Sequence, residues 1–213
     1  MTDLKKTKPF FNDLIGKKLS QFKNFEYNLE NFEGKPKLYP YLDTVGYITT
    51  CKGQNVDNQD TFLNTNWLYD NRPAKLSEKK IAFNTLKSLP YGNGYKAESF
   101  AKKTNLTLPE EYCEQAYKQD LNKHYNQLQN SVPNFNRMPF PTKLAMLETH
   151  YNTGSLTNEN KWPNLHKYAR EYNQSLLCKN LKRSVWDKNG NKIANMPQRN
   201  NWAYEYCMLE PFE

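Results

Sequence analysis

Apolar residues recur every three or four positions between residues 10 and 32, which is the period of an amphipathic helix. The stripe consists of Phe11, Leu14, Ile15, Leu19, Phe22, Leu29 and Phe32. Gly16 interrupts the stripe and is a point where the helix would break in two. The pattern stops at Gly34, which is followed by Pro36, and both residue types favour the end of a helix. The sequence therefore places Glu33 at the exit of an N-terminal helix.

A different pattern follows between Leu38 and Val56, where aromatic and β-branched residues predominate. Such residues favour strands, and Gly46 and Gly53 interrupt them in the manner of turns. We therefore expect a small antiparallel hairpin sheet over residues 38–57. Residues 57–75 are rich in Asn and Asp and are predicted to form a loop.

Helical patterns dominate the rest of the chain. One helix is predicted from Ser77, a candidate N-cap, to the residue before Pro90. Another begins at Thr107, whose spacing to Glu110 fits a capping box. Further helices are predicted over 142–151, 163–181 and 199–209, the last of them after a charged turn at 187–192.

Together these elements predict an α+β fold that is mostly α. With 213 residues and 37% hydrophobic content, the chain can bury one sizeable core, so we expect a single domain over 1–213. Within it, residues 10–75 would form an N-terminal helix and β lobe and residues 76–213 a helical lobe, with 1–9 disordered.

Charge and cysteine spacing limit the function classes. The net charge of +8 favours a polyanionic partner, which could be nucleic acid, an anionic membrane surface or an acidic wall polymer. The cysteines form no CxxC pair and are expected to be reduced, buried thiols. The three histidines form no HExxH motif, so neither a metal site nor a cofactor is expected.

The amino-terminal segment has early lysines but no uninterrupted apolar core of about seven residues, so it does not resemble a signal peptide. No apolar stretch approaches the roughly 18 to 20 residues that span a bilayer. We expect a soluble protein that is made in the cytoplasm and does not insert into a membrane. It would reach a target outside the cytoplasm only after release by lysis or by non-classical secretion.

Two carboxyl groups in the helix-to-hairpin region are candidates for acid-base chemistry. Glu33 follows Phe32 at the end of an apolar helix, where partial desolvation would raise the carboxyl pKa and keep the group protonated. Asp43, in a polar turn before Gly46, would stay ionised. Glycosidic bond hydrolysis needs a proton for the leaving oxygen and, on the other face of the sugar, either a carboxylate nucleophile or a positioned water. The spacing alone is weak evidence, because Glu33 could be a solvated charge and Asp43 the cap of a turn.

The string FEGKPKLYPYLDTVGYITTCKG, residues 32–53, resembles the active-site segment of the phage-type lysozymes, glycoside hydrolase family 24. In that family a Glu-Gly pair at a helix end leads into a hairpin with Tyr, Asp, Gly and a Thr-containing strand. The matching positions are Glu33, Gly34, Tyr41, Asp43, Gly46, Thr49 and Gly53.

A second block, LAMLETHYNTGSLTNENKWPNL at residues 144–165, resembles the helix, Asn-x-Gly turn and following helix of many endolysins of this family. The matching positions are Asn152, Gly154, Trp162 and Pro163. A looser match is PQRNNW, which contains Arg199 where such enzymes carry an arginine near the last helix.

The resemblance implies a lysozyme-like fold in which a β-hairpin lobe and a larger helical lobe border a cleft. It implies a muramidase in which Glu33 protonates the glycosidic oxygen while Asp43 and Thr49 orient a water on the opposite face, with inversion of configuration. A threonine hydroxyl both accepts and donates hydrogen bonds, so it can hold such a water together with a carboxylate.

Tyr47, Asn152 and Arg199 are candidates for contacts with the sugar or the peptide stem. Each also has a structural explanation, namely strand packing for Tyr47, a turn for Asn152 and a surface charge for Arg199. The sequence leaves both interpretations open for all three residues.

Three features depart from the family pattern. The gap between Glu33 and Asp43 is one residue longer than usual, Cys51 replaces the first glycine of the family's Gly-x-Gly-His motif, and Gln54 stands where His is common. A side chain at position 51 would crowd the turn if the backbone there has a positive φ.

Other functions also fit the sequence. A lysozyme-like protein that binds wall glycans with little or no hydrolysis would account for Cys51 and Gln54, and a lytic transglycosylase would need Glu33 without a water-holding Asp43. No nucleic-acid partner is expected, because neither a recognition helix nor an RNP-like strand is visible. The expected partner is the glycan strand of peptidoglycan, bound by a monomer. An immunity protein would accompany it only if the protein is a secreted effector.

Overall fold

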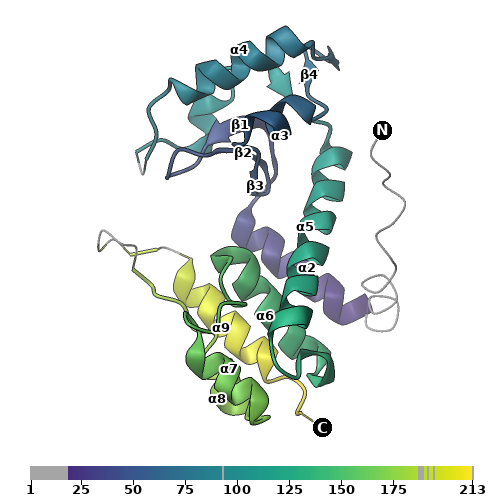
Figure 1. The fold of residues 1–213 in the computed structure, drawn as a ribbon, viewed down its shortest axis with the longest axis vertical. Coiled ribbons are helices and arrows are strands. Elements are labelled where there is room, and N and C mark those ends of the chain that lie inside the picture. Colours follow the sequence, from purple (N-terminus) through teal and green to yellow (C-terminus); the bar gives the residue numbers. More distant parts are fainter. Residues whose placement is uncertain (1–18, 93, 187–189, 191, 194, 213) are drawn as a thin grey trace. The chain divides into compact units, whose positions relative to one another are not determined.

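The computed structural model describes residues 19–92, 94–186, 190, 192–193 and 195–212 (Figure 1). The predicted class is confirmed: the fold is α+β and mostly α, with two three-stranded antiparallel sheets. The expected disorder at 1–9 and the expected break at Gly16 lie outside the described residues.

The chain divides into two compact units. Unit 2 comprises Glu33–Asp120, and unit 1 contains the described residues up to Phe32 together with those from Leu121 onward. This division differs from the expected boundary between residues 75 and 76, because the helix that follows residue 75 buries its apolar face in the same core as the first sheet.

The first sheet of unit 2 lies where the alternating aromatic and β-branched residues predict it. Its strands are β1 (Lys37–Leu42), β2 (Ile48–Cys51) and β3 (Gln54–Asn55), in the order β1-β2-β3 and all antiparallel. Thr49 of β2 is opposite Tyr41 of β1 and opposite Asn55 of β3. Thr49 is therefore on the central strand of this sheet.

The predicted loop at 57–75 is wrong, because this segment contains a helix and a hairpin. Helix α3 (Gln59–Asn64) begins after Asn58, whose side chain accepts a hydrogen bond from Thr61 N at 3.0 Å. Strands β4 (Leu68–Tyr69) and β5 (Arg72–Pro73) follow. Asp70 and Asn71 connect them with φ of 48° and 64°, a left-handed turn that these residue types tolerate best after glycine.

The remainder of unit 2 contains α4 (Leu76–Lys87), the 3-10 helix η1 (Ala97–Phe100), β6 (Leu106–Thr107) and the first part of α5 (Glu110–Ser131). Strand β6 pairs with β4, and the second sheet has the order β5-β4-β6. Thr107 is therefore opposite Leu68 in a strand, and the capping box predicted from Thr107 is wrong.

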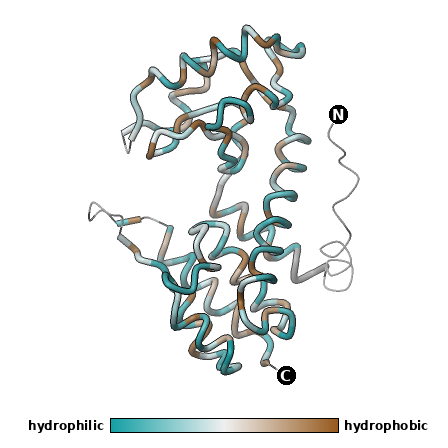
Figure 2. The backbone as a smooth tube through the Cα atoms, viewed as in Figure 1, coloured by the Kyte–Doolittle hydropathy of each residue, from teal (hydrophilic) through white to brown (hydrophobic). Residues whose placement is uncertain are grey.

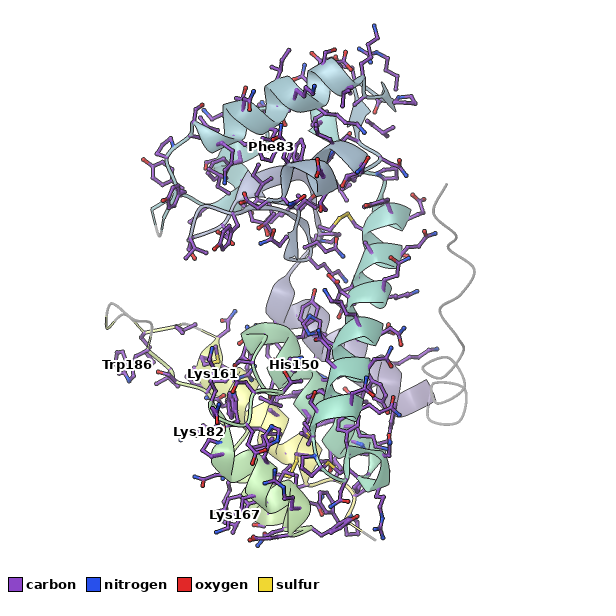
Figure 3. All side chains as sticks on the ribbon, in the orientation of Figure 1. Phe83, His150, Lys161, Lys167, Lys182 and Trp186 are labelled. Atoms are coloured by element: carbon purple, nitrogen blue, oxygen red, sulfur yellow. A yellow bond between two sulfur atoms is a disulfide. The ribbon has the colours of Figure 1, made fainter. Side chains whose placement is uncertain are left out.

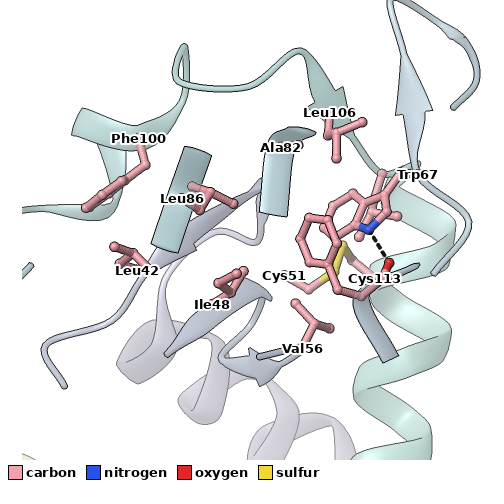
Figure 4. Packing of buried hydrophobic residues seen from close by; sticks show 12 residues of the cluster. Leu42, Ile48, Cys51, Val56, Trp67, Ala82, Leu86, Phe100, Leu106 and Cys113 are labelled. Carbon is pink, nitrogen blue, oxygen red and sulfur yellow. Dashed lines mark hydrogen bonds between the residues drawn. A yellow bond between two sulfur atoms is a disulfide. The ribbon is translucent and has the colours of Figure 1, made fainter. Parts of the chain in front are cut away.

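Buried hydrophobic residues from the strands and helices of unit 2 pack into one core (Figure 4). Its buried members are Leu42, Ile48, Cys51, Val56, Phe62, Trp67, Ala82, Leu86, Phe100, Leu106, Leu108 and Cys113. The indole Nε1 of Trp67 donates to the carbonyl oxygen of Phe62 at 2.9 Å, so this large side chain is buried without losing its hydrogen bond.

Unit 1 is helical. Its elements are α2 (Leu19–Glu33), the second part of α5, η2 (Phe135–Arg137), α6 (Phe140–Thr153), α7 (Pro163–Arg170), α8 (Gln174–Lys179) and α9 (Met196–Cys207). Helix α6 packs against α9, and α8 packs against both α7 and α9. Figure 2 shows that polar and apolar positions are interspersed along these helices. No helix in the described part of the chain is long and apolar enough to cross a membrane.

The single helix predicted over 163–181 is instead divided into α7 and α8. Tyr172 lies between them with a φ of 53°, which a continuous helix cannot contain. The side chain of Asn173 then accepts a hydrogen bond from Leu176 N at 3.2 Å and caps α8. The apolar period continues across this break, so the period alone suggests one helix.

All four cysteines are paired, which contradicts the expected reduced thiols. Cys51 bonds to Cys113 within unit 2, and Cys178 bonds to Cys207 within unit 1. The first bond joins the end of β2 to the first turn of α5, and the second joins α8 to α9. The expectation failed because the paired cysteines are separated by 62 and 29 positions in the sequence, and no local pattern indicates that they are close in the fold.

His150 of α6 is a buried neutral histidine (Figure 3). Leu156 N donates to its Nδ1 at 3.3 Å, which leaves the proton on Nε2 to be donated to Gln127 Oε1 at 3.1 Å. Burial, with a smaller contribution from the charge of nearby His124, lowers the pKa of His150 from 6.5 to about 4.

We expect this histidine to make unit 1 sensitive to acid. Between pH 6.5 and 4 the unfolded chain binds a proton at position 150 that the folded chain does not bind, so stability is lost as the pH falls through this window. The loss from this residue should be about 2 kcal/mol at pH 4.5. Urea unfolding at pH 7.5 and 4.5 measures it, with His150→Asn as the variant that keeps an acceptor for Leu156 N and removes the titration. An equal acid loss in wild type and variant would contradict the assignment.

Candidate active site

The helix exit predicted at Glu33 is present in the backbone. Helix α2 ends at Glu33, Gly34 follows with a φ of 75°, and β1 begins at Lys37. A glycine with positive φ directly after the last helical residue is the usual way to end a helix and to redirect the chain. The side chain of Glu33 lies outside the described residues, so the structure places the backbone of this residue and nothing more.

Asp43 organises the turn between β1 and β2. Its Oδ1 accepts hydrogen bonds from Val45 N and Tyr47 N, both at 2.9 Å. Its own amide donates to the carbonyl oxygen of Tyr47 at 2.9 Å, and its carbonyl accepts from Gly46 N at 3.1 Å. The turn-capping role expected of an isolated aspartate is therefore present. The second carboxylate oxygen, Oδ2, has no hydrogen-bond partner within the described part of the chain and remains able to accept one.

Thr49 is held to the same turn. Its hydroxyl donates to the carbonyl oxygen of Tyr47 at 3.3 Å, and the amide of Asp43 donates to that same oxygen. The side chain of Thr49 is buried. The hydroxyl proton of Thr49 is donated to the carbonyl oxygen of Tyr47. Thr49 Oγ1 can therefore still accept a hydrogen bond through its lone pairs, for example from a water. Asp43 and Thr49 are thus brought together around the backbone of Tyr47.

A charged pair, Asp57 and Lys87, forms hydrogen bonds that stabilise this turn, and the sequence did not predict it. Asp57 Oδ1 accepts from Ile48 N at 2.8 Å and from Lys87 Nζ at 2.8 Å, and Lys87 also donates to the carbonyl oxygen of Gly46 at 3.3 Å. Partial burial raises the pKa of Asp57, but the hydrogen bonds from Lys87 and Ile48 outweigh it, and the pKa is lowered. The 30 residues between Asp57 and Lys87 explain why no motif indicated the pair.

Two of the three departures from the lysozyme pattern, Cys51 and Gln54, flank the second turn, which connects β2 and β3. Cys51 has a φ of 53° and Gly53 a φ of 89°, so the positive φ that would make a side chain at position 51 unfavourable is present. The disulfide to Cys113 holds Cys51 in this conformation. Gln54 is buried, and its Nε2 has no partner within the described residues.

The three predicted substrate contacts fall in different units. Tyr47 is half exposed on the Asp43 turn of unit 2, in keeping with a contact residue. Asn152 and Arg199 belong to unit 1. Asn152 is exposed, whereas Arg199 is buried with its Nε bonded to Glu148 Oε1 at 2.8 Å. This geometry favours an internal role for Arg199 over the predicted contact with substrate.

Glu148 is the centre of a polar network inside unit 1. Arg183 Nη1 donates to the same Oε1 at 2.9 Å and lies 3.5 Å from Asn152 Oδ1. The side-chain oxygen of Asn200 accepts from both the backbone amide and Nε of Arg183. A buried carboxylate needs such partners because an unpaired buried charge costs several kcal/mol. The clue in the sequence is an acid within the apolar run LAMLETH of α6.

No group of three or more His, Cys, Asp or Glu side chains that could hold a metal ion occurs among the residues described. Unit 2 instead offers a carboxylate, Asp43, directly after strand β1, and a hydroxyl, Thr49, on the next strand β2. Both side chains are hydrogen-bonded to the backbone of Tyr47. Such a set can position a water and accept its proton.

Comparison of the chain with models of known protein families, and with curated proteins, finds no match in either case. The resemblance of residues 32–53 and 144–165 to phage-type lysozymes therefore stands on the motifs themselves.

Proposed function

We propose that the protein is a muramidase, a glycoside hydrolase that cleaves the β-1,4 bond between N-acetylmuramic acid and N-acetylglucosamine in peptidoglycan. One observation carries the proposal. Helix α2 ends at Glu33, and the hairpin that follows anchors both Asp43 and Thr49 on the backbone of Tyr47. This is the order of helix, turn and strand that the resemblance to the phage-type lysozymes implies for the catalytic residues.

In the proposed reaction, Glu33 donates its proton to the glycosidic oxygen as the bond from that oxygen to the anomeric carbon breaks. A water held by Asp43 Oδ2 and Thr49 Oγ1 attacks the anomeric carbon from the opposite face and transfers a proton to Asp43. The product has inverted configuration. Because Asp43 Oδ1 already accepts two backbone amides, the carboxylate is fixed in orientation before the water binds.

The charge of the chain supports this substrate class. Peptidoglycan stems carry carboxylates, and a net charge of +8 attracts the protein to such a polyanion. Tyr47 is half exposed beside Asp43 and is the predicted contact residue that the geometry favours most. Asn152 remains a predicted contact from unit 1.

The two disulfides support action outside the reducing cytoplasm. Disulfides persist in the periplasm and outside the cell, and they are rare in cytosolic proteins. We propose that the protein acts on the cell wall after its release.

Digestion of purified peptidoglycan sacculi tests the proposal directly. We expect soluble muropeptides with hydrated, reducing N-acetylmuramic ends, identified by mass spectrometry. Ends in the 1,6-anhydro form would instead show a lytic transglycosylase. Sacculi that bind the protein but release nothing would show a wall-binding protein without hydrolytic activity, and either result would overturn the muramidase assignment.

A further inference from the structure

The ring of Tyr91 lies flat on the turn that carries Asp43. A Cβ atom built on Gly46 would lie 2.9, 2.9 and 3.0 Å from Cε1, Cζ and Cε2 of Tyr91. These three carbons are almost equidistant and are closer than the phenol oxygen, so Gly46 faces the flat side of the ring and not its edge. Gly46 also has a φ of +89°, and both features require a glycine there.

The segment that contains Tyr91 is tied to this turn by Lys87. The ammonium group of Lys87 donates to the carbonyl oxygen of Gly46 and to Asp57 Oδ1, at 3.3 and 2.8 Å. Tyr91 follows four residues later, after the end of α4. Two interactions therefore hold the Tyr91 ring beside the turn: the hydrogen bonds of Lys87 and the contact of the ring with Gly46.

The other face of the ring is open to solvent. Tyr91 is 57% exposed, and the neighbouring turn residues Val45 and Tyr47 are 52% and 50% exposed. Contiguous exposed apolar surface is a feature of ligand-binding sites. One face of the Tyr91 ring is covered by Gly46, and the free face is a flat apolar surface.

We propose that Tyr91 forms a saccharide-binding subsite beside Asp43, in which the apolar C–H face of a pyranose ring stacks on the free face of the tyrosine. Tyr47 borders the same turn and contributes to this subsite. The choice of a saccharide over other flat apolar ligands rests on the proposed function. The stacking geometry itself rests on the contact between Tyr91 and Gly46 and on the exposure of the ring.

Binding of a soluble β-1,4-linked N-acetylglucosamine oligomer, measured by calorimetry, tests the subsite without requiring any cleavage. We expect Tyr91→Ala to raise the Kd roughly five- to tenfold, because the stacking contact is lost. Tyr91→Phe should keep the wild-type Kd, since it keeps the ring. Tyr95→Ala is the matched control, because Tyr95 is a similarly exposed tyrosine four residues away.

Three results with the variants would contradict the proposed subsite. These are an unchanged Kd in Tyr91→Ala, a loss of affinity in Tyr91→Phe equal to that in Tyr91→Ala, and an equal loss of affinity in Tyr95→Ala. Failure of the wild-type protein to bind the oligomer would also overturn it. These results are independent of sacculus digestion, which can succeed when the subsite fails. Where digestion is observed, Tyr91→Ala should raise KM by the same factor and leave kcat unchanged, and thermal unfolding of each variant separates this effect from a loss of stability.

Discussion

Replacing Glu33 with glutamine is expected to lower the rate of sacculus digestion by about 10² to 10⁴-fold, the range that a general acid contributes. Glutamine has nearly the shape of the acid, but its amide cannot give the leaving oxygen a proton. Binding of the glycan should change little. Release of reducing ends from sacculi over time measures the rate, and sedimentation with sacculi measures binding.

Two companion variants make this result specific. Glu26→Gln removes a carboxylate two turns earlier on α2 and should leave the rate unchanged. Asp43→Asn keeps an oxygen that can accept from Val45 N and Tyr47 N, so the turn should form while the base is lost. A strong rate loss in Asp43→Asn with unchanged stability would separate catalysis from turn capping. Full activity in Glu33→Gln would reject the proposed general acid.

Removing the bond between Cys51 and Cys113 is expected to lower the free energy of unfolding of unit 2 by about 4 kcal/mol. The bond closes a loop across 62 positions, and chain-entropy reasoning for a loop of this length gives that magnitude. Denaturant unfolding of Cys51→Ser/Cys113→Ser, compared with the wild type, measures the loss. Reduction of Cys178→Ser/Cys207→Ser, in which only this bond is left, should reproduce it.

The bond between Cys178 and Cys207 provides the matched control. It closes a shorter loop in unit 1, so Cys178→Ser/Cys207→Ser should be destabilised by a similar amount, about 3 to 4 kcal/mol. Only the first double variant changes the end of β2, two residues after Thr49. We therefore expect the 51–113 variant to lose digestion activity at denaturant or temperature levels that the 178–207 variant tolerates. The opposite ranking would contradict a role of Cys51 in stabilising the hairpin that carries the candidate catalytic residues.

Local patterns predicted the elements around the candidate site well. The stripe up to Phe32 and the stop at Gly34 located the end of α2, and the β-branched run located β1 and β2. These predictions depend on residues close in sequence. The failures at Thr107 and Tyr172 have different causes. Thr107 pairs with a strand that is distant in sequence, whereas the positive φ of Tyr172 interrupts a helix whose apolar period continues unbroken.

The supporting interactions of the candidate site could not be predicted in the same way. The brace between Asp57 and Lys87, the disulfide at Cys51 and the contact of Tyr91 with Gly46 all join residues far apart in the chain. No period or motif connects such pairs. The sequence could name Asp43 as a catalytic candidate, but only the fold shows that one of its oxygens is occupied by the turn and the other is not.

The bond between Cys51 and Cys113 also changes how the protein responds to a cut in its backbone. Residues 52–112 form a covalent loop that contains α3, α4 and η1. A protease that cleaves one peptide bond in this loop leaves both fragments joined, and Glu33, Asp43 and Thr49 stay linked to α5. A molecule nicked in this loop would keep the hairpin that carries the candidate catalytic residues attached to the rest of the chain.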